Sequence, residues 1–177
     1  MSIGKALKKA RQQAGESQTV VSMEANCARE SISAYETGRA NTPADIFRFA
    51  MGRYKDPALA REAASNYYGT YFIPNLNGKN VDLHRCAVTM KSEEEFEEAF
   101  NALKQIKKFL TKQPSAIRDY EKQEIVTAAQ EVAESMTAGF YFLSALKEYD
   151  ISWNDIWESH HRELVSKGFS QAGSSRI

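Results

Sequence analysis

Apolar residues recur every three or four positions along most of the chain, which is the spacing of amphipathic helices. The first such stretch, residues 3–14, places Ile3, Leu7 and Ala10 on one face and lysines on the others, and Gly15 ends it. Each later stretch is bounded by Ser, Asn, Gly or Pro, which are common at helix ends. Further short helices are predicted over residues 17–25, 29–37, 43–52 and 57–68.

The second half of the chain predicts longer helices. Apolar spacing is helical over residues 83–90, and Ser92 with Glu95 matches a capping box, which predicts that a helix opens there and runs to about Leu110. Residues 119–148 carry apolar positions at alternating spacings of four and three, typical of helical bundles. A last helix is predicted from the N-cap Ser152 to Gly168.

These patterns predict an all-α fold with two parts, because no stretch shows the alternation of a strand. Residues 67–80 mix aromatics with Gly, Pro and Asn, which breaks the helical period and indicates a domain boundary. We therefore expect a five-helix domain followed by a helical bundle, with a polar and disordered tail. The predicted divisions are residues 1–68, a connector at 69–79, a second domain at 80–168 and the tail at 169–177.

Charge is unevenly distributed over the 177 residues, although the formal net charge is zero. Residues 1–66 hold ten Lys and Arg against seven Asp and Glu, whereas residues 67–177 hold thirteen against sixteen. Lys5, Lys8 and Lys9 lie in a segment without acids, which is a surface that attracts phosphate or simply a solvated helix face. Only two cysteines occur, without CxxC spacing, and no apolar run is long enough to cross a membrane. We expect a reduced, soluble, cytoplasmic protein.

Residues 15–41 predict two short helices joined by a tight turn. In a helix-turn-helix, the second helix enters the DNA major groove and the first lies across the backbone. The segment also resembles the phage-repressor-like helix-turn-helix proteins of the XRE (Cro/cI) type, over residues 3 to 50. The matching residues are Gly15, Ser17, Gln18, Val21, Arg29, Ile32, Ser33, Tyr35, Glu36, Gly38 and, one place late, Pro43.

The resemblance implies roles for individual residues. Gln18 inherits a phosphate contact, and Arg11 with Glu36 inherits an ion pair between the first and third helices. Two positions depart from the family pattern, because Ala28 replaces a Ser or Thr cap and Asn26 replaces the turn glycine. The residues expected to read bases are Arg29, Glu30, Ser33 and Ala34, and those expected to hold phosphate are Gln18, Ser31, Arg39 and Asn41.

The function implied is a sequence-specific transcriptional regulator, with a repressor from a phage, prophage or conjugative element favoured. Its expected partners are double-stranded DNA, a second copy of the chain and an antirepressor protein. The second domain is expected to oligomerise or receive a signal, with Phe140, Trp153 and Trp157 at the interface. A well-filled monomeric core also explains these aromatics. The competing function is an antitoxin or adaptor that captures a protein partner.

An enzyme, a cofactor and a metal site are not expected. Glutamates at positions 94–98 and 131–134 faintly resemble the magnesium motifs of all-α nucleotide pyrophosphatases, but the final Asp is missing. That remote alternative is kept open. His160 and His161 are adjacent and point about 100° apart on a helix, so they do not share one metal in the i, i+4 manner.

Overall fold

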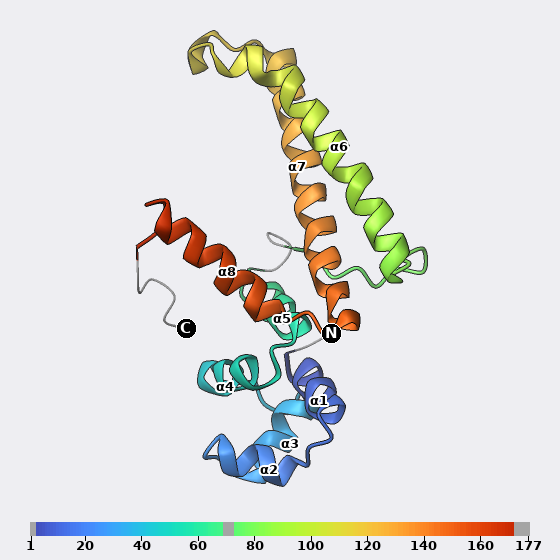
Figure 1. Ribbon diagram of the computed structural model, residues 1–177, viewed down its shortest axis with the longest axis vertical. Coiled ribbons are helices and arrows are strands. Elements are labelled where there is room, and N and C mark those ends of the chain that lie inside the picture. Colours follow the sequence, from blue (N-terminus) through green and yellow to red (C-terminus); the bar gives the residue numbers. More distant parts are fainter. Residues whose placement is uncertain (1–2, 69–72, 172–177) are drawn as a thin grey trace. The chain divides into compact units, whose positions relative to one another are not determined.

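A computed structural model describes residues 3–68 and 73–171, and within these ranges the chain is helical, without strands. The all-α prediction is therefore confirmed. The predicted connector and tail lie partly outside the described residues, at 69–72 and 172–177. The helices are α1 (Ile3–Gln13), α2 (Gln18–Glu24), α3 (Arg29–Thr37), α4 (Ala44–Tyr54), α5 (Pro57–Tyr68), α6 (Arg85–Leu110), α7 (Asp119–Ala145) and α8 (Trp153–Ser166) (Figure 1).

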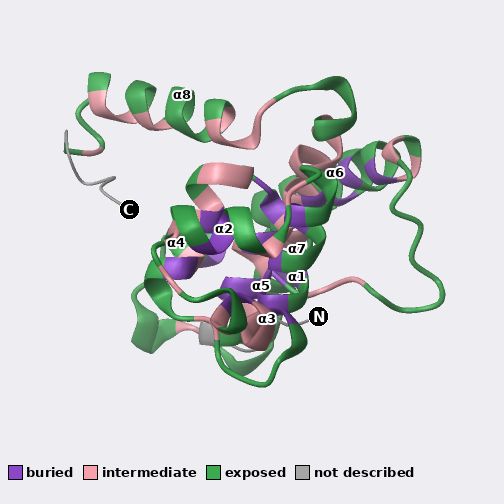
Figure 2. Cartoon of the chain, turned by 90° about the horizontal axis from the view of Figure 1, so that it is seen from below, coloured by how far each residue is buried: buried purple, intermediate pink, exposed green. Residues whose placement is uncertain are grey.

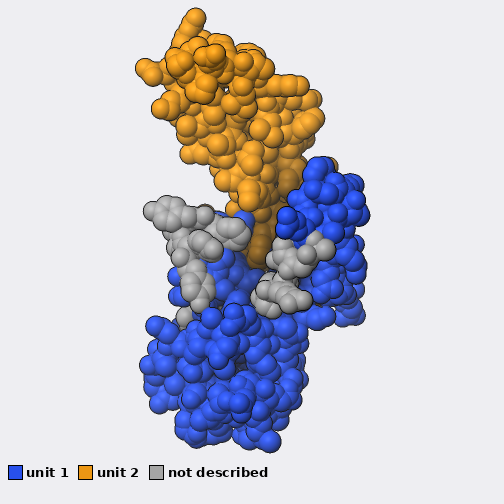
Figure 3. All heavy atoms as spheres, turned by 90° about the vertical axis from the view of Figure 1, so that its left-hand side faces the viewer, with its two compact units in different colours: residues 1–75, 149–177 blue, residues 76–148 orange. Residues whose placement is uncertain are grey.

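The chain divides into two compact units (Figure 3). One contains the described residues up to 75 together with residues 149–171, and the other contains residues 76–148. The sequence predicts one domain over residues 80–168, whereas α8 groups with α1 to α5 in the structure. Local spacing predicts helices but not which helices cluster, which is the physical reason for this difference.

The short helices α1 to α5 of the first unit end within a residue of the prediction, except that α4 continues to Tyr54, past the predicted end at Gly52. Ser17 caps α2, because its side chain accepts a hydrogen bond from the backbone N–H of Val20 at 3.2 Å. Gly38 ends α3 with a φ of 75°, in the left-handed conformation that glycine adopts without steric cost. Ala28 is the N-cap residue of α3, and its side chain makes no capping hydrogen bond. The helices are therefore short and sharply bounded.

One apolar cluster joins α1 to α5. Leu7, Val21, Ile32 and Leu59 are almost fully inaccessible to solvent, and each comes from a different helix. Their burial is the main favourable term for this unit, because each large aliphatic side chain removed from water contributes about 1.5–3 kcal/mol. Figure 2 shows buried residues in purple within these helices, whereas α8 has none. The core therefore fixes α2 and α3 against α1.

Unit 76–148 is built on two long antiparallel helices, α6 and α7. The predicted helix start at Ser92 is wrong, because α6 begins at Arg85 and Ser92 lies in its interior. Ser92 is buried, and its hydroxyl lies 2.8 Å from the carbonyl of Val88 and 3.1 Å from that of Ala138. Ser92 therefore contacts the carbonyl of its own helix and one of α7, and it does not cap a helix. A serine inside a helix can bond to the carbonyl four residues earlier in this way.

The connection between α6 and α7 is closed by a buried carboxylate. Glu121 accepts hydrogen bonds from Lys112 at 2.6 Å and from the backbone N–H of Arg118 at 3.0 Å. These contacts lower the pKa of Glu121 to about 2, with the Lys112 bond as the largest cause. Ile106, Phe109 and Ala128 form a small core beside this turn.

Helix α8 begins and ends as predicted. The Ser152 side chain accepts from the backbone N–H of Asp155 at 3.3 Å, and Gly168 takes a φ of 74° after the helix. Trp153 and Trp157 lie one turn apart with ring centroids separated by 5.7 Å. No helix within the described ranges is long and apolar enough to span a membrane.

Gly4 allows the backbone of α1 to approach that of α3 more closely than a residue with a side chain at this position would allow. A Cβ atom at Gly4 would lie 1.8 Å from the carbonyl oxygen of Tyr35. We expect Gly4→Ala to lower the free energy of unfolding by about 1–3 kcal/mol, because the two backbones must separate. Thermal or urea unfolding followed by circular dichroism measures this change.

Gly52→Ala is the matched control, since a Cβ at this α4 position meets nothing within 4 Å. Alanine is the better helix former, so this variant should gain about 0.5–1 kcal/mol. Equal effects of the two substitutions would contradict the close approach of α1 and α3.

Candidate nucleic-acid interface

Helices α2 and α3 are joined by a four-residue turn, residues 25–28, whose backbone conformation is fixed by a left-handed residue and a hydrogen bond. Asn26 has a φ of 50°, which is the left-handed conformation predicted for it. The backbone N–H of Cys27 then bonds to the carbonyl of Ser22 at 2.9 Å, and its side chain packs against the core. Val21 and Ile32 lock the two helices together from the inside. The outer face of α3 is consequently held at a fixed angle to α2.

A buried ion pair joins α1 to α3. Arg11 Nε lies 2.6 Å from Glu36 Oε1, and Arg11 Nη2 lies 2.8 Å from Glu36 Oε2, a two-pronged geometry. Only 8% of Arg11 and 2% of Glu36 are exposed. Gln18 donates to Glu36 Oε2 at 2.8 Å, so the first residue of α2 belongs to the same network.

The network favours the charged form of Glu36. Burial raises the pKa of this carboxyl, but hydrogen bonds from Arg11 and Gln18 outweigh it, so the pKa lies below its ordinary value. Arg11 also donates to the backbone carbonyl of Glu16 at 2.7 Å. One guanidinium therefore holds the end of α1, the α1–α2 turn and the last turn of α3.

A second network, which no motif in the sequence indicates, joins α4 to the same α1–α2 turn. Arg53 Nε lies 2.9 and 3.0 Å from the two carboxylate oxygens of Glu16, and the Tyr54 hydroxyl donates to Glu16 at 2.8 Å. Arg53 also pairs with Glu24 at the end of α2. The Arg53 hydrogen bonds lower the pKa of Glu16. These partners are 29 to 38 residues apart, so no local spacing indicates them.

The residues predicted to read bases lie together on the short helix α3. Arg29 and Glu30 are exposed and pair with each other at 3.2 Å, whereas Ser33 and Ala34 are half-buried. An exposed ion pair contributes little stability, so Arg29 can exchange Glu30 for a base edge at small cost. The helix thus presents a charged N-terminal end and small side chains behind it.

The residues predicted to hold phosphate lie on α2, on α3 and in the segment just after α3. Gln18 is half-buried at the N-terminus of α2, and one of its two amide N–H groups is used by Glu36. Ser31 is half-buried, and Asn41 is exposed beyond α3. Arg39 folds back so that its guanidinium lies 3.3 Å from the Ser33 hydroxyl. The second N–H of Gln18 and the Arg39 guanidinium are the donors best suited to a phosphate.

Several glutamates of α1 to α5 and their connections pair with arginine. Glu16, Glu24 and Glu36 contact Arg53 or Arg11, and Glu62 contacts Arg61. Lys5, Lys8 and Lys9 are exposed on α1. Helix α1 contains no acidic residue, so these lysines form a local group of positive charge on its surface.

Neither a family model, a curated protein nor a solved structure matches this chain.

The aromatics predicted to form one oligomer interface fall in different units. Phe140 is on α7 of unit 76–148, half-buried and edge-on to Tyr141 at 5.8 Å. Trp153 and Trp157 are on α8, which groups with the first unit, and 46% of Trp157 is exposed. Nothing in the described structure joins these three residues in a single surface of one unit.

Arg11→Met should lower the free energy of unfolding by about 3 kcal/mol, because Glu36 would be left as a buried charge without its partner. Arg48→Met is the matched control on the exposed face of α4 and should change it by less than about 0.5 kcal/mol. Urea unfolding at neutral pH compares the two. A loss of similar size in both variants would contradict the structural role of the pair.

Acid should destabilise the first unit through Glu36 and Glu16. Both carboxyls have folded-state pKa values below the ordinary value of about 4.3, so the unfolded chain binds protons first as the pH falls. Their contribution is complete at neutral pH and is lost progressively below about pH 4. Unfolding of wild type and Glu36→Gln between pH 7 and 3 tests this, since the variant should lose less stability over that range.

Proposed function

We propose that this protein is a sequence-specific DNA-binding transcriptional regulator in which α3 enters the major groove. The observation that carries the proposal is the clamping of α3 by the buried Arg11–Glu36 pair, with Arg29 and Glu30 exposed on its outer end. A helix that reads base edges must be held rigidly relative to the elements that contact the backbone. The tight turn at Asn26 and the packing of Val21 on Ile32 support that rigidity.

In this proposal the exposed end of α3 reads bases. Arg29 donates two hydrogen bonds to a guanine, and Glu30 accepts from a cytosine amino group. Ser33 and Ala34 lie farther along the helix, where a small side chain allows close approach to the groove. Gln18, Ser31, Arg39 and Asn41 hold the backbone on either side and set the register.

A regulator of this kind binds as a dimer, because one short helix reads only a few base pairs. Unit 76–148 offers a surface for this association. Phe96, Phe100 and Leu103 are each about half exposed and recur at i, i+4 and i+7 on α6. An exposed apolar stripe of this length is typical of a helix that packs on another chain. We therefore propose a homo-oligomer, and repression at an inverted repeat in the manner of phage regulators.

The same apolar stripe is also suited to binding a different protein. In that alternative function, this chain is an antitoxin or adaptor that captures a protein partner. Light scattering of the purified chain separates the two functions. A stable homodimer that binds duplex DNA supports the regulator, whereas a monomer that recovers a second protein at fixed stoichiometry supports the adaptor.

Selection from a random duplex pool should enrich an inverted repeat with half-sites about 10 base pairs apart, and Arg29→Ala should then weaken binding to it. The expected loss is about 1–3 kcal/mol, with relaxed preference at one base position, because a bidentate guanine contact is removed. Arg39→Ala is the comparison, and it should weaken selected and random duplexes alike. Equal loss on both duplexes for Arg29→Ala would show that Arg29 contacts phosphate.

DNA binding should weaken steeply as the salt concentration rises. Protein binding releases cations condensed on the DNA phosphates, and a higher salt concentration opposes that release. The exposed lysines of α1 are expected to contribute, so Lys8→Ala with Lys9→Ala should flatten the plot of log affinity against log salt. The measurement is fluorescence anisotropy at several salt concentrations. An unchanged slope in the double variant would place this face of α1 away from DNA.

A further inference from the structure

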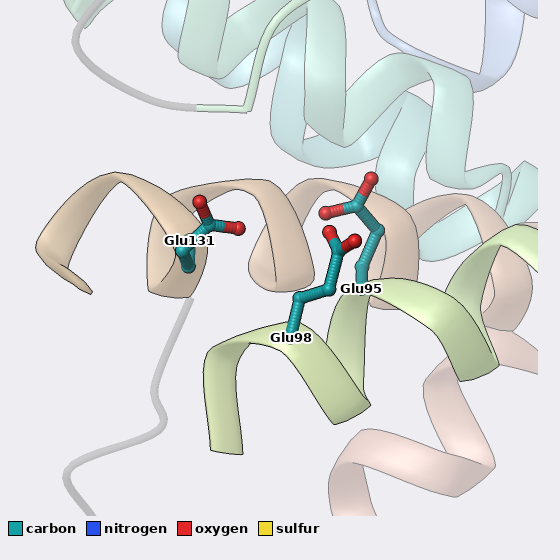
Figure 4. Close-up of side chains that lie close together, drawn as sticks. All are labelled: Glu95, Glu98 and Glu131. Atoms are coloured by element: carbon teal, nitrogen blue, oxygen red, sulfur yellow. The ribbon is translucent and has the colours of Figure 1, made fainter. Parts of the chain in front are cut away.

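Three glutamates from two helices meet in unit 76–148. Glu95 and Glu98 lie one turn apart on α6, and Glu131 lies opposite them on the antiparallel helix α7. One carboxylate oxygen from each residue lies within 4.8 Å of the other two. Figure 4 shows the carboxyl groups of Glu95 and Glu98 side by side on α6, with that of Glu131 turned toward them. We call this set the glutamate cluster.

Glu95 is the buried member of the glutamate cluster, with only 6% of the residue exposed. Its Oε1 atom is 2.8 Å from Lys91 Nζ. Its Oε2 atom is buried and has no hydrogen-bond partner among the residues that the structure describes. A buried carboxylate oxygen without a partner is costly and rare in folded proteins, so it calls for a ligand.

The charges around the cluster are mostly of one sign. Glu134 lies three residues from Glu131 on α7 and adds a further carboxylate beside the cluster. Lys91 contacts Glu95 at 2.8 Å, but its ammonium also contacts Glu94 on the same helix. The negative charges are therefore not fully compensated by the neighbouring lysine.

We propose that the glutamate cluster binds a hard divalent cation such as Mg²⁺, Mn²⁺ or Ca²⁺ between α6 and α7. Such ions take carboxylate oxygens at about 2.0–2.6 Å, so any two ligand oxygens of one ion lie no more than about 4–5 Å apart. The three carboxylate oxygens of the cluster, all within 4.8 Å of one another, satisfy this limit. Water molecules complete the coordination on the exposed side of Glu98.

A bound cation would join α6 to α7 through three charge contacts. Glu95 Oε2 would acquire the partner that it lacks, and the repulsion between Glu98 and Glu131 would be removed. Cation binding should therefore stabilise unit 76–148. The glutamates at positions 94–98 and 131–134 match a magnesium motif only faintly, because the final Asp is missing, so a metal site is not expected from the sequence. The packing of α6 on α7 brings Glu95, Glu98 and Glu131 together.

The test uses the full-length protein, freed of metal with a chelator and titrated with Mn²⁺. Electron paramagnetic resonance of free Mn²⁺ should show one saturable site per chain with a dissociation constant below about 1 mM, the range of weak carboxylate sites. Competition with Mg²⁺ and with Ca²⁺ in separate titrations identifies the preferred ion. Glu131→Gln and Glu98→Gln should each weaken Mn²⁺ binding at least tenfold.

Glu97→Gln is the matched control, because Glu97 is an exposed glutamate of α6 outside the cluster. It removes the same charge from the same helix and should leave Mn²⁺ affinity within about twofold, the effect of long-range charge alone. Equal weakening by Glu97→Gln and Glu98→Gln would overturn the proposal, as would the absence of saturable binding below about 1 mM.

Thermal unfolding supplies a second readout that does not depend on detecting bound metal. Mn²⁺ should raise the melting temperature of wild type and of Glu97→Gln, but not that of Glu98→Gln. Glu98 is exposed, so its substitution should not prevent folding, and circular dichroism verifies this. The same rise in all three proteins would overturn the proposal.

Discussion

The buried Arg11–Glu36 ion pair is the interaction on which the first unit depends. Arg11 lies in the last turn of α1 and Glu36 in the last turn of α3. Gln18, the first residue of α2, bonds to the same carboxylate. A buried pair adds little net stability compared with apolar side chains of equal size, but removing one partner is costly. The ion pair mainly fixes the arrangement of α1, α2 and α3, because all three helices contribute a side chain to the hydrogen bonds at Glu36.

The outer elements reinforce this geometry from another side. Arg53 on α4 contacts Glu16 in the α1–α2 turn and Glu24 at the end of α2, while Gly4 lets α1 lie directly on the end of α3. Helix α3 is thus restrained at its C-terminal end and along its inner face. Its N-terminal end, with Arg29 and Glu30, projects toward solvent. A rigid helix with a charged, exposed end is what the proposed reading of base edges requires.

Local features of the fold could be predicted from the sequence, because caps and apolar spacing act over a few residues. The ends of α3 and α8, the left-handed turn at Asn26 and the all-helical class belong to this group. Contacts between distant residues could not be predicted in this way. The Arg53–Glu16 pair and the Gly4 approach require knowledge of which helices pack together. The glutamates of the cluster form a faint motif in the sequence, but whether their carboxylates meet depends on the register of α6 against α7. Ser92 shows the limit most plainly, since a cap and a buried helix contact share one local pattern.

The central claim is that α3 is the DNA-contacting surface of this protein. Amide NMR of the isotopically labelled full chain, titrated with a duplex of about 20 base pairs, tests it most directly. The account predicts that signals shift most for residues 28–34 and for Gln18 and Arg39, with smaller changes in unit 76–148. Shifts confined to other residues, with residues 28–34 unchanged at saturating DNA, would contradict it.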